Sequence, residues 1–220
     1  MPDTPKIPGL VQKKDGSYGF TVECPNGFIT KEILKAAHEV CRNFNCRLHI
    51  TTAQKLMFLD LDQESGARAV ELLEQAGASV RKARDLSQPR VCVGKPYCKF
   101  GVQDSLALGD TLYNELARMA TPPKLKYAVS GCLACCAWSN LMDLGFAGVK
   151  SGFRVIVGGH GGFRPKTGTE IGKVTSHEQA VEVLRKAAEL FRQEIPKKGR
   201  MAKVIKKIGV EEVKRYLAFE

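Results

Sequence analysis

The stretch GCLACCAWSN carries three cysteines, Cys132, Cys135 and Cys136, within five consecutive positions. Two more, Cys92 and Cys98, lie earlier in the segment CVGKPYC, so that five of the 8 cysteines fall into two short glycine-containing segments. Thiols that gather in loops of this kind are typical of ligands to a metal ion or an iron–sulfur cluster. The two segments therefore predict a metal centre that ties distant parts of the chain together.

Spacing favours one kind of metal centre but leaves the choice of ligands open. The first pair forms C-x5-C, and the later group forms either C-x2-C or C-x3-C. Zinc is usually held at ~2.3 Å by four ligands from short cysteine turns, and C-x5-C is wider than those turns. A [4Fe–4S] cluster also takes four thiolates, at corners that lie farther apart. The spacing thus favours a cluster over zinc, and burial of the thiols as core residues remains the other alternative.

The rest of the composition is that of an ordinary soluble globular chain, with 44% hydrophobic and 26% charged residues. No apolar run approaches the ~20 residues that cross a bilayer. The first residues, MPDTPKIPGL, lack the apolar core of a signal peptide. We therefore expect a cytoplasmic protein without a membrane partner, whose thiols stay reduced and form no disulfide framework.

The formal net charge of +11 raises the question of a nucleic-acid partner. The basic residues are dispersed, however, and no zinc-finger, RNP or helix-turn-helix pattern accompanies them. In the densest region, residues 196–220, the apolar positions have helical spacing, so that the lysines are expected on a solvated face. Small anions or an acidic protein are the expected partners, and nucleic acid is not.

The first 80 residues predict a compact β-α-β-β-α unit. Strands are expected over residues 17–24, 46–52 and 55–61, and Thr30 and Ser65 are positioned as the N-caps of two helices. Apolar residues of the first helix fall at helical spacing, at Ile33, Leu34, Ala37, Val40, Cys41 and Phe44. The cysteines of this section are interpreted as small core residues: Cys24, Cys41 and Cys46.

The second section, residues 81–220, begins with a polar connector that ends at Pro89. A helix is expected near residues 106–119, after the first cysteine segment. Strands are then expected over the ranges 125–131, 143–149 and 153–159. The glycine-rich turn GGHGGFRPKTG follows, and two or three helices complete the chain.

The residues around the cysteines resemble the signature of the sirohaem-dependent nitrite and sulfite reductases. C-x5-C followed by C-x3-C has the intervals of that family, and the first pair is accompanied by the family's Gly94, Gly101 and Asp104. Three further segments match family patterns: KLKYAVSGC, VIVGGHGGFRP and CPNGFITKEIL. The resemblance covers almost the whole chain and is greatest to the small, single-repeat, assimilatory-type sulfite reductases.

This resemblance implies an α+β fold, with a ferredoxin-like half-domain over residues 1–80 and an α/β sirohaem- and [4Fe–4S]-binding domain over residues 81–220. It also implies which thiols bind the cluster. The implied ligands are Cys92, Cys98, Cys132 and Cys136. The thiolate of Cys136 would bridge the cluster to the iron of sirohaem, and Cys135 would be the spare thiol.

The family reduces sulfite or nitrite by six electrons, and its pattern implies roles for cationic residues of this chain. Lys124 and Lys126 match two lysines that bind the oxyanion and supply protons. The carboxylates of sirohaem require cations and exposed backbone N–H groups. The residues expected to supply them are Arg47, Gly159, His160, Gly161, Arg164 and Lys166. An acidic electron donor such as ferredoxin and a homodimer are the expected partners.

The chain departs from the family pattern where arginines are expected. Thr21 and Ala53 occupy the positions of two arginines that bind substrate or sirohaem, and Leu133-Ala134 replaces the usual Pro-Asn between the last ligand cysteines. Neither Thr nor Ala can replace the charge of a guanidinium group. Two alternatives to a sulfite or nitrite reductase therefore stay open. One is a protein of the same fold that transfers electrons or binds a tetrapyrrole without sulfite chemistry, and the other is a zinc-stabilised or nucleic-acid-binding module.

Overall fold

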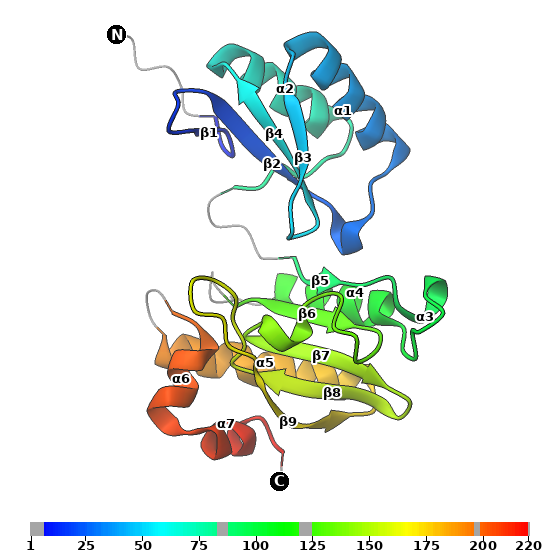
Figure 1. The fold of residues 1–220 in the computed structure, drawn as a ribbon, viewed down its shortest axis with the longest axis vertical. Helices are drawn as coiled ribbons and strands as arrows, with labels where there is room; N and C mark the ends of the chain where they lie inside the picture. The colour runs from blue at the N-terminus through cyan, green and yellow to red at the C-terminus, as the bar shows by residue number, and fades with distance from the viewer. Residues whose placement is uncertain (1–6, 83–87, 119–124, 196–198, 220) are drawn as a thin grey trace. The chain divides into compact units, whose positions relative to one another are not determined.

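The computed structural model describes residues 7–82, 88–118, 125–195 and 199–219 (Figure 1). The chain divides into two compact units, Met1–Asp85 and Leu86–Glu220. Each unit has its own sheet and its own apolar core. No helix in the described part of the chain has the length and hydropathy that crossing a bilayer requires.

The first unit contains an antiparallel sheet of strand order β1-β2-β4-β3 and two helices. Its strands are β1 (Val11–Gln12), β2 (Tyr18–Glu23), β3 (Arg47–Ile50) and β4 (Lys55–Leu61). The 3-10 helix η1 (Pro25–Gly27) leads into α1 (Lys31–Phe44), and β4 leads into α2 (Gln63–Gln75). Figure 1 shows the two helices side by side, and their apolar residues share one core with the sheet around the stacked rings of Phe20 and Phe58.

Local signals in this unit were interpreted correctly in most places. The Thr30 Oγ1 caps α1 by accepting the N–H of Ile33, and the cysteines expected in the core belong to it: Cys24, Cys41 and Cys46. The predicted cap of α2 was wrong, because Asp62 caps the helix and accepts the N–H of Ser65. Leu34, expected on the apolar side of α1, has 59% of its surface exposed.

The second unit contains a five-stranded sheet of order β5-β6-β7-β8-β9. The strands are β5 (Arg90–Val91), β6 (Tyr127–Ser130), β7 (Leu144–Val149), β8 (Gly152–Val157) and β9 (Thr169–Val174). β5, β6 and β7 are parallel, and β8 and β9 add antiparallel strands. The helices are α3 (Gly94–Tyr97), α4 (Ser105–Ala117), η2 (Ser139–Leu141), α5 (His177–Glu194), α6 (Met201–Ile208) and α7 (Val210–Tyr216).

Two strands of this sheet were missing from the sequence-based description. β5 has two residues, and β9, TEIGKV, has only two buried side chains, so neither has a strong alternating pattern. Both form because a neighbouring strand supplies backbone hydrogen-bond partners: β5 pairs with β6, and β9 pairs with β8. Two or three helices were expected after the glycine-rich turn; α5, α6 and α7 are present there, and they are preceded by β9.

The two faces of this sheet differ in the size of their side chains. Large residues such as Tyr127, Val129 and Phe146 belong to the main core, which also includes residues of α4 and α5. The alternate positions of the same strands carry small residues, among them Ala128, Ser130, Gly145 and Ala147. Successive side chains of a strand point to opposite faces, so one face is filled with large apolar groups and the other has room for a loop to lie close to the backbone.

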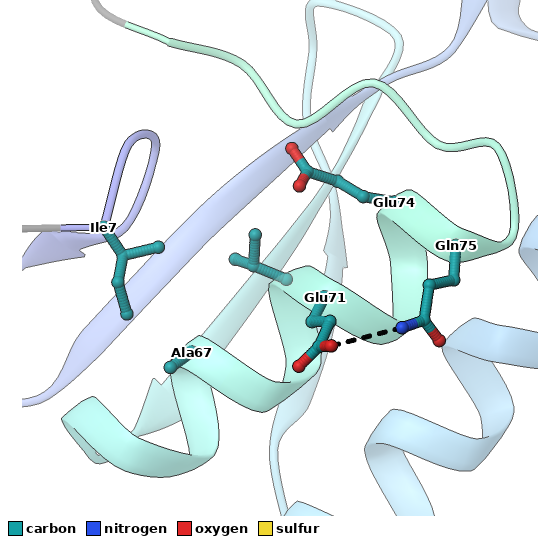
Figure 2. A pocket seen from close by; sticks show the side chains of 6 residues that line it. Ile7, Ala67, Glu71, Glu74 and Gln75 are labelled. Carbon is teal, nitrogen blue, oxygen red and sulfur yellow. Dashed lines mark hydrogen bonds between the residues drawn. The ribbon is translucent and has the colours of Figure 1, made fainter.

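A shallow pocket lies in the first unit, between Ile7 and α2 (Figure 2). Its polar residues come from one helix, where the Gln75 side chain donates a hydrogen bond of 3.2 Å to Glu71. The residues that line it include no cysteine and no cation. None of the candidate site residues lines this pocket.

Candidate functional site

The five clustered cysteines lie on two loops that follow neighbouring parallel strands. The first cysteine loop, residues 92–104, follows β5, and the second cysteine loop, residues 131–143, follows β6. Parallel neighbours end at the same edge of a sheet, so the beginnings of the two loops are adjacent. The Gly131 N–H donates to the Cys92 Sγ at 3.0 Å, which places the sulfur of one loop against the backbone of the other.

Four glycines allow this contact by letting backbone segments approach closely. A Cβ on Gly131 would lie 2.6 Å from the Cα of Gly94, and a Cβ on Gly101 would lie 2.5 Å from the carbonyl carbon of Gly94. A Cβ on Gly148 would lie 2.4 Å from the Gly131 oxygen. We call these residues the glycine column. No side chain larger than hydrogen fits at its contact points unless the backbone moves.

The first cysteine loop is held in shape by backbone hydrogen bonds. The Cys98 N–H donates to the Gly94 oxygen at 2.8 Å, and the Gly101 N–H donates to the Cys98 oxygen at 2.9 Å. The N–H groups of Val102 and Gln103 both donate to the Gly131 oxygen, at 2.9 and 3.0 Å. The half-buried thiol of Cys98 is therefore carried on a turn with a defined conformation.

The adjacent cysteines of the second cysteine loop, Cys135 and Cys136, differ in hydrogen bonding and in exposure. Cys135 has a φ of 59°, and its Sγ accepts the N–H of Asn140 at 3.2 Å. The Cys135 oxygen also accepts the N–H of Trp138 at 2.8 Å. Cys136 is the exposed cysteine of the chain. The Cys135 sulfur thus has a structural partner within its own loop, whereas the Cys136 thiol is accessible.

A buried carboxylate fixes the end of the second cysteine loop. Asp143 has no exposed surface, and its oxygens accept hydrogen bonds from the Arg200 Nε at 2.8 and 3.0 Å. They also accept the N–H groups of Lys126 at 2.9 Å and Met201 at 2.8 Å. Burial raises the pKa of the Asp143 carboxyl, while Arg200 and the two N–H groups oppose that shift. The carboxylate thereby joins the starts of β6, β7 and α6.

A second arginine of this region is partly desolvated. The guanidinium of Arg90, on β5, stacks over the Trp138 ring at 4.6 Å. Its Nη1 is buried and has no hydrogen-bond partner among the residues that the structure describes. Burial, together with the positive charge of Arg200, lowers the pKa of the Arg90 guanidinium. A buried donor of this kind suits an anionic group bound nearby.

Of the two lysines expected to bind an oxyanion, Lys126 lies within the residues that the structure describes and Lys124 does not. Lys126 is exposed and lies immediately before β6, with its backbone N–H held by Asp143. Lys124 lies outside the described residues.

The glycine-rich turn expected to hold cofactor carboxylates forms an exposed loop after β8. His160 and Lys166 exchange backbone hydrogen bonds of 2.8 and 2.9 Å, which close the loop between them. This loop contacts the second cysteine loop at Gly159, where a Cβ would lie 2.3 Å from the Asn140 oxygen. Gly161 and Arg164 are exposed between the closing pair.

The first unit contains Arg47 and the positions where family arginines are missing. Arg47 is exposed on β3 and forms an ion pair with Asp60. Lys55 forms a buried ion pair with Glu23, which also accepts a hydrogen bond from Arg81 at 2.8 Å. Thr21 lies on β2, and Ala53 lies in the turn between β3 and β4. The cations near these positions are thus paired with carboxylates.

The thiol arrangement fits a cluster better than a single metal ion. All eight cysteines are free thiols. In the described ranges, no group of three or more His, Cys, Asp and Glu side chains is close enough to hold one ion. A cluster has corners that lie farther apart, and the two loops in contact through the glycine column carry five thiols after neighbouring strands. The residues present therefore fit an iron–sulfur cluster.

Comparison with known proteins identifies the family. A model described as "Nitrite and sulphite reductase 4Fe-4S domain" matches residues 82–219, and one described as "Nitrite/Sulfite reductase ferredoxin-like half domain" matches residues 11–76. The chain belongs to the nitrite and sulfite reductase family. This membership agrees with the resemblance seen in the sequence and with the α+β fold, and it favours an iron–sulfur cluster over zinc.

Two relatives differ in the share of their length that this chain covers. The assimilatory-type sulfite reductase of Nitratidesulfovibrio vulgaris is 33% identical over 219 residues, which cover 98% of both chains. The nitrite reductase (NADH) large subunit of Escherichia coli is 33% identical over 156 residues, covering 70% of this chain but 18% of that protein. The chain thus has the length of the first relative and corresponds to a small part of the second.

Solved structures share the fold at low sequence identity. The Mycobacterium tuberculosis NirA protein has a TM-score of 0.77 and 19% identity, with 97% of this chain and 42% of that chain covered. Dissimilatory sulfite reductase I has a TM-score of 0.74 and 11% identity, with 93% and 69% covered.

Sequence reasoning named the cysteines and exposed cations of this site but missed the groups that support them. Arg90 carries a weak signal, because it lies two residues before Cys92. Asp143 and Arg200 carry none, because they are far apart in the chain and meet only in the folded unit. The sequence showed Gly94 and Gly101 beside the first cysteine pair, but it did not show that the four glycines of the glycine column lie in contact.

We expect Gly131→Ala to separate the two cysteine loops, because the added methyl group meets the backbone of Gly94. Overpacking of this kind costs about 1–3 kcal/mol of unfolding free energy. Urea denaturation measures that loss, and iron analysis of anaerobically purified protein should show less iron per chain. Gly66→Ala is the matched control, because the atoms nearest to its methyl group belong to the Leu10 side chain and not to backbone. Equal iron content in both variants would contradict the prediction.

The ligand assignment predicts opposite results for adjacent cysteines. Cys136→Ser should lose most of the iron and acid-labile sulfide. Cys135→Ser should retain both, because a serine oxygen can still accept the Asn140 N–H. Iron and sulfide analysis of the two proteins, prepared together, checks this expectation. A similar loss in both variants would show that the assignment is wrong.

Proposed function

We propose that this protein reduces sulfite or nitrite, using a [4Fe–4S] cluster and sirohaem held by its second unit. The observation that carries the proposal is the contact between the two cysteine loops through the glycine column, in a chain of this family. The contact brings thiols from distant parts of the sequence to one edge of the sheet. Buried and exposed cations lie on the neighbouring segments, as a polyanionic cofactor and an oxyanion substrate require.

The proposed cluster ligands are Cys92, Cys98, Cys132 and Cys136. The Gly131 N–H already donates to the Cys92 sulfur, and hydrogen bonds of this kind stabilise a thiolate and adjust the reduction potential of a cluster. Exposure of Cys136 suits a thiolate shared with a second metal group. When bound, the cluster and sirohaem supply stored electrons and an iron atom that accepts the oxyanion.

Cationic side chains are proposed to hold the carboxylates of sirohaem. The loop closed by His160 and Lys166 presents Arg164 and backbone N–H groups to solvent on a short, constrained segment. The Arg90 Nη1 offers a buried donor for one further anionic oxygen. Arg47 is the proposed contribution of the first unit, although it would have to exchange its ion pair with Asp60.

Lys124 and Lys126 are proposed to bind the oxyanion. An ammonium group lowers the energy of an anion near it and can donate a proton as an oxygen leaves. The Lys126 backbone is fixed by Asp143, so its exposed side chain starts from a defined position. Asp143 is a positioning residue in this scheme, because it acts on the substrate only through Lys126.

The partners and compartment follow from charge and thiol chemistry. The net charge of +11 suits an acidic electron donor such as a ferredoxin. The proposed compartment is the cytoplasm, which keeps thiols reduced. A homodimer is proposed as one way for a single-repeat chain to complete its cofactor site.

A second candidate function is a protein of the same fold that binds the cofactors but does not reduce sulfite. Two observations favour it: Thr21 and Ala53 replace arginines of the family pattern, and Lys55 is neutralised by the buried Glu23. Such a protein would retain electron storage without the charges that bind the substrate.

A spectrum and an assay separate the two candidates. Anaerobically purified, cofactor-loaded protein should show sirohaem absorption bands together with the broad absorption of an iron–sulfur cluster. With reduced methyl viologen as donor, it should consume sulfite or nitrite and release sulfide or ammonia. Full cofactor occupancy without product would refute the reductase and favour the second candidate.

The role of Lys126 can be tested through the Michaelis constant. Lys126→Ala should raise KM for the anion by roughly 10- to 150-fold, because a charged hydrogen bond contributes about 1.5–3 kcal/mol. Lys150→Ala is the control, since Lys150 is exposed in the same unit on the turn between β7 and β8. Unchanged KM and unchanged sirohaem content in Lys126→Ala would make this lysine an ordinary surface residue.

A further inference from the structure

The first cysteine loop exposes several large apolar side chains close together in the sequence. Tyr97 is 71% exposed, Phe100 is 67% exposed and Val93 is 45% exposed. They are interleaved with exposed Lys95 and Lys99. We call the exposed side chains of this segment, including Val102, the 93–102 surface. Clustered apolar side chains bordered by charges are typical of a protein–protein contact rather than of free surface.

The 93–102 surface is supported by hydrogen bonds and by a close backbone contact. The Lys95 N–H donates to the Gln103 oxygen at 2.9 Å, and Gly101 packs directly on the backbone of Gly94. The Lys99 ammonium lies 5.0 Å from the centre of the Phe100 ring, which holds a charge next to the largest apolar group. A surface that is already ordered loses little conformational entropy when it binds a partner.

The charge of the region selects the kind of partner. Residues 91–103 contain two lysines and no acidic residue, and residues 131–142 contain no charged residue at all. Asp104, at the boundary, is engaged as the N-cap of α4. The whole chain carries a formal charge of +11. An acidic protein would therefore be attracted over a distance and would meet no carboxylate on these two segments.

The position of the surface connects it to the site. Cys98 lies between Tyr97 and Lys99, so a protein that contacts this segment lies over one of the proposed cluster ligands. α3 begins shortly after β5, which is the edge strand of the sheet, and it packs against α4. We propose that the 93–102 surface is the docking site of an acidic electron-transfer protein, an inference that rests on the proposed function. Contacts of this class are small and sensitive to salt.

Binding of a defined probe tests the inference without relying on turnover. An acidic plant-type [2Fe–2S] ferredoxin is titrated into the cofactor-loaded protein by calorimetry, at low and at high ionic strength. Wild-type protein should bind at low salt and weaken as salt is added. Lys95→Glu combined with Lys99→Glu should raise the dissociation constant by roughly tenfold or more.

Matched variants control for net charge and for loss of an aromatic group. Lys203→Glu combined with Lys206→Glu makes the same charge change on exposed positions of α6, and it should affect binding much less. Phe100→Ser should weaken binding at high salt as well, whereas Phe28→Ser, at an aromatic residue that is 51% exposed in the first unit, should not. Iron content, measured for every variant, shows whether the cluster is retained.

Several outcomes would overturn the docking site. The first is that wild-type protein does not bind ferredoxin, and the second is that the control variants weaken ferredoxin binding as much as the test variants do. The third is that sedimentation shows Phe100→Ser to convert a dimer into a monomer. The last result would assign the surface to a second copy of the chain. Failure of the proposed function is distinguishable, because it appears as absent viologen-driven sulfite and nitrite reduction in a wild type that still binds ferredoxin.

Discussion

Close approach of backbone at the glycine column is the constraint on which the second unit depends. Gly94, Gly101, Gly131 and Gly148 stack so tightly that a methyl group at the last three would overlap main-chain atoms. This contact joins the two cysteine loops through the backbone of the chain itself, so folding bears part of the energetic cost of ordering the thiols. A cluster that binds preordered ligands loses less entropy than one that must gather them.

The sheet below the loops makes that approach possible. Its strands place large apolar residues such as Phe146 against α4 and α5, and small residues such as Gly145 on the other side. A Cβ on Gly145 would lie 2.0 Å from the Ser139 oxygen, so the second cysteine loop rests directly on the strand. Asp143 and Arg200 then fix the end of that loop with a buried ion pair. Removing either partner of such a pair is costly, because the remaining charge is left buried without compensation.

Much of the fold and part of the site could be predicted because the signals are local. The cap at Thr30, the strand that begins at Lys55 and the spacing of Cys92 and Cys98 are all contained within a few residues. β9 could not be predicted, because its pairing with β8 determines it and its own side chains are mostly exposed. Leu34 was assigned to the core by periodicity, but the helix turns it toward solvent. Arg90, Asp143 and Arg200 were missed because their roles depend on partners distant in the chain.

The amino-acid sequence by itself determined the family of this protein, the presence of thiols for a cluster, and the positive net charge that suits anionic partners. Residue types and intervals carry that information, because chemistry at a metal centre depends on which atoms are available. The tertiary structure decided how the thiols differ. It engages the Cys135 sulfur with the Asn140 N–H, leaves Cys136 exposed, and turns Tyr97 and Phe100 outward. Those properties arise from packing between segments, and no interval within the sequence contains them.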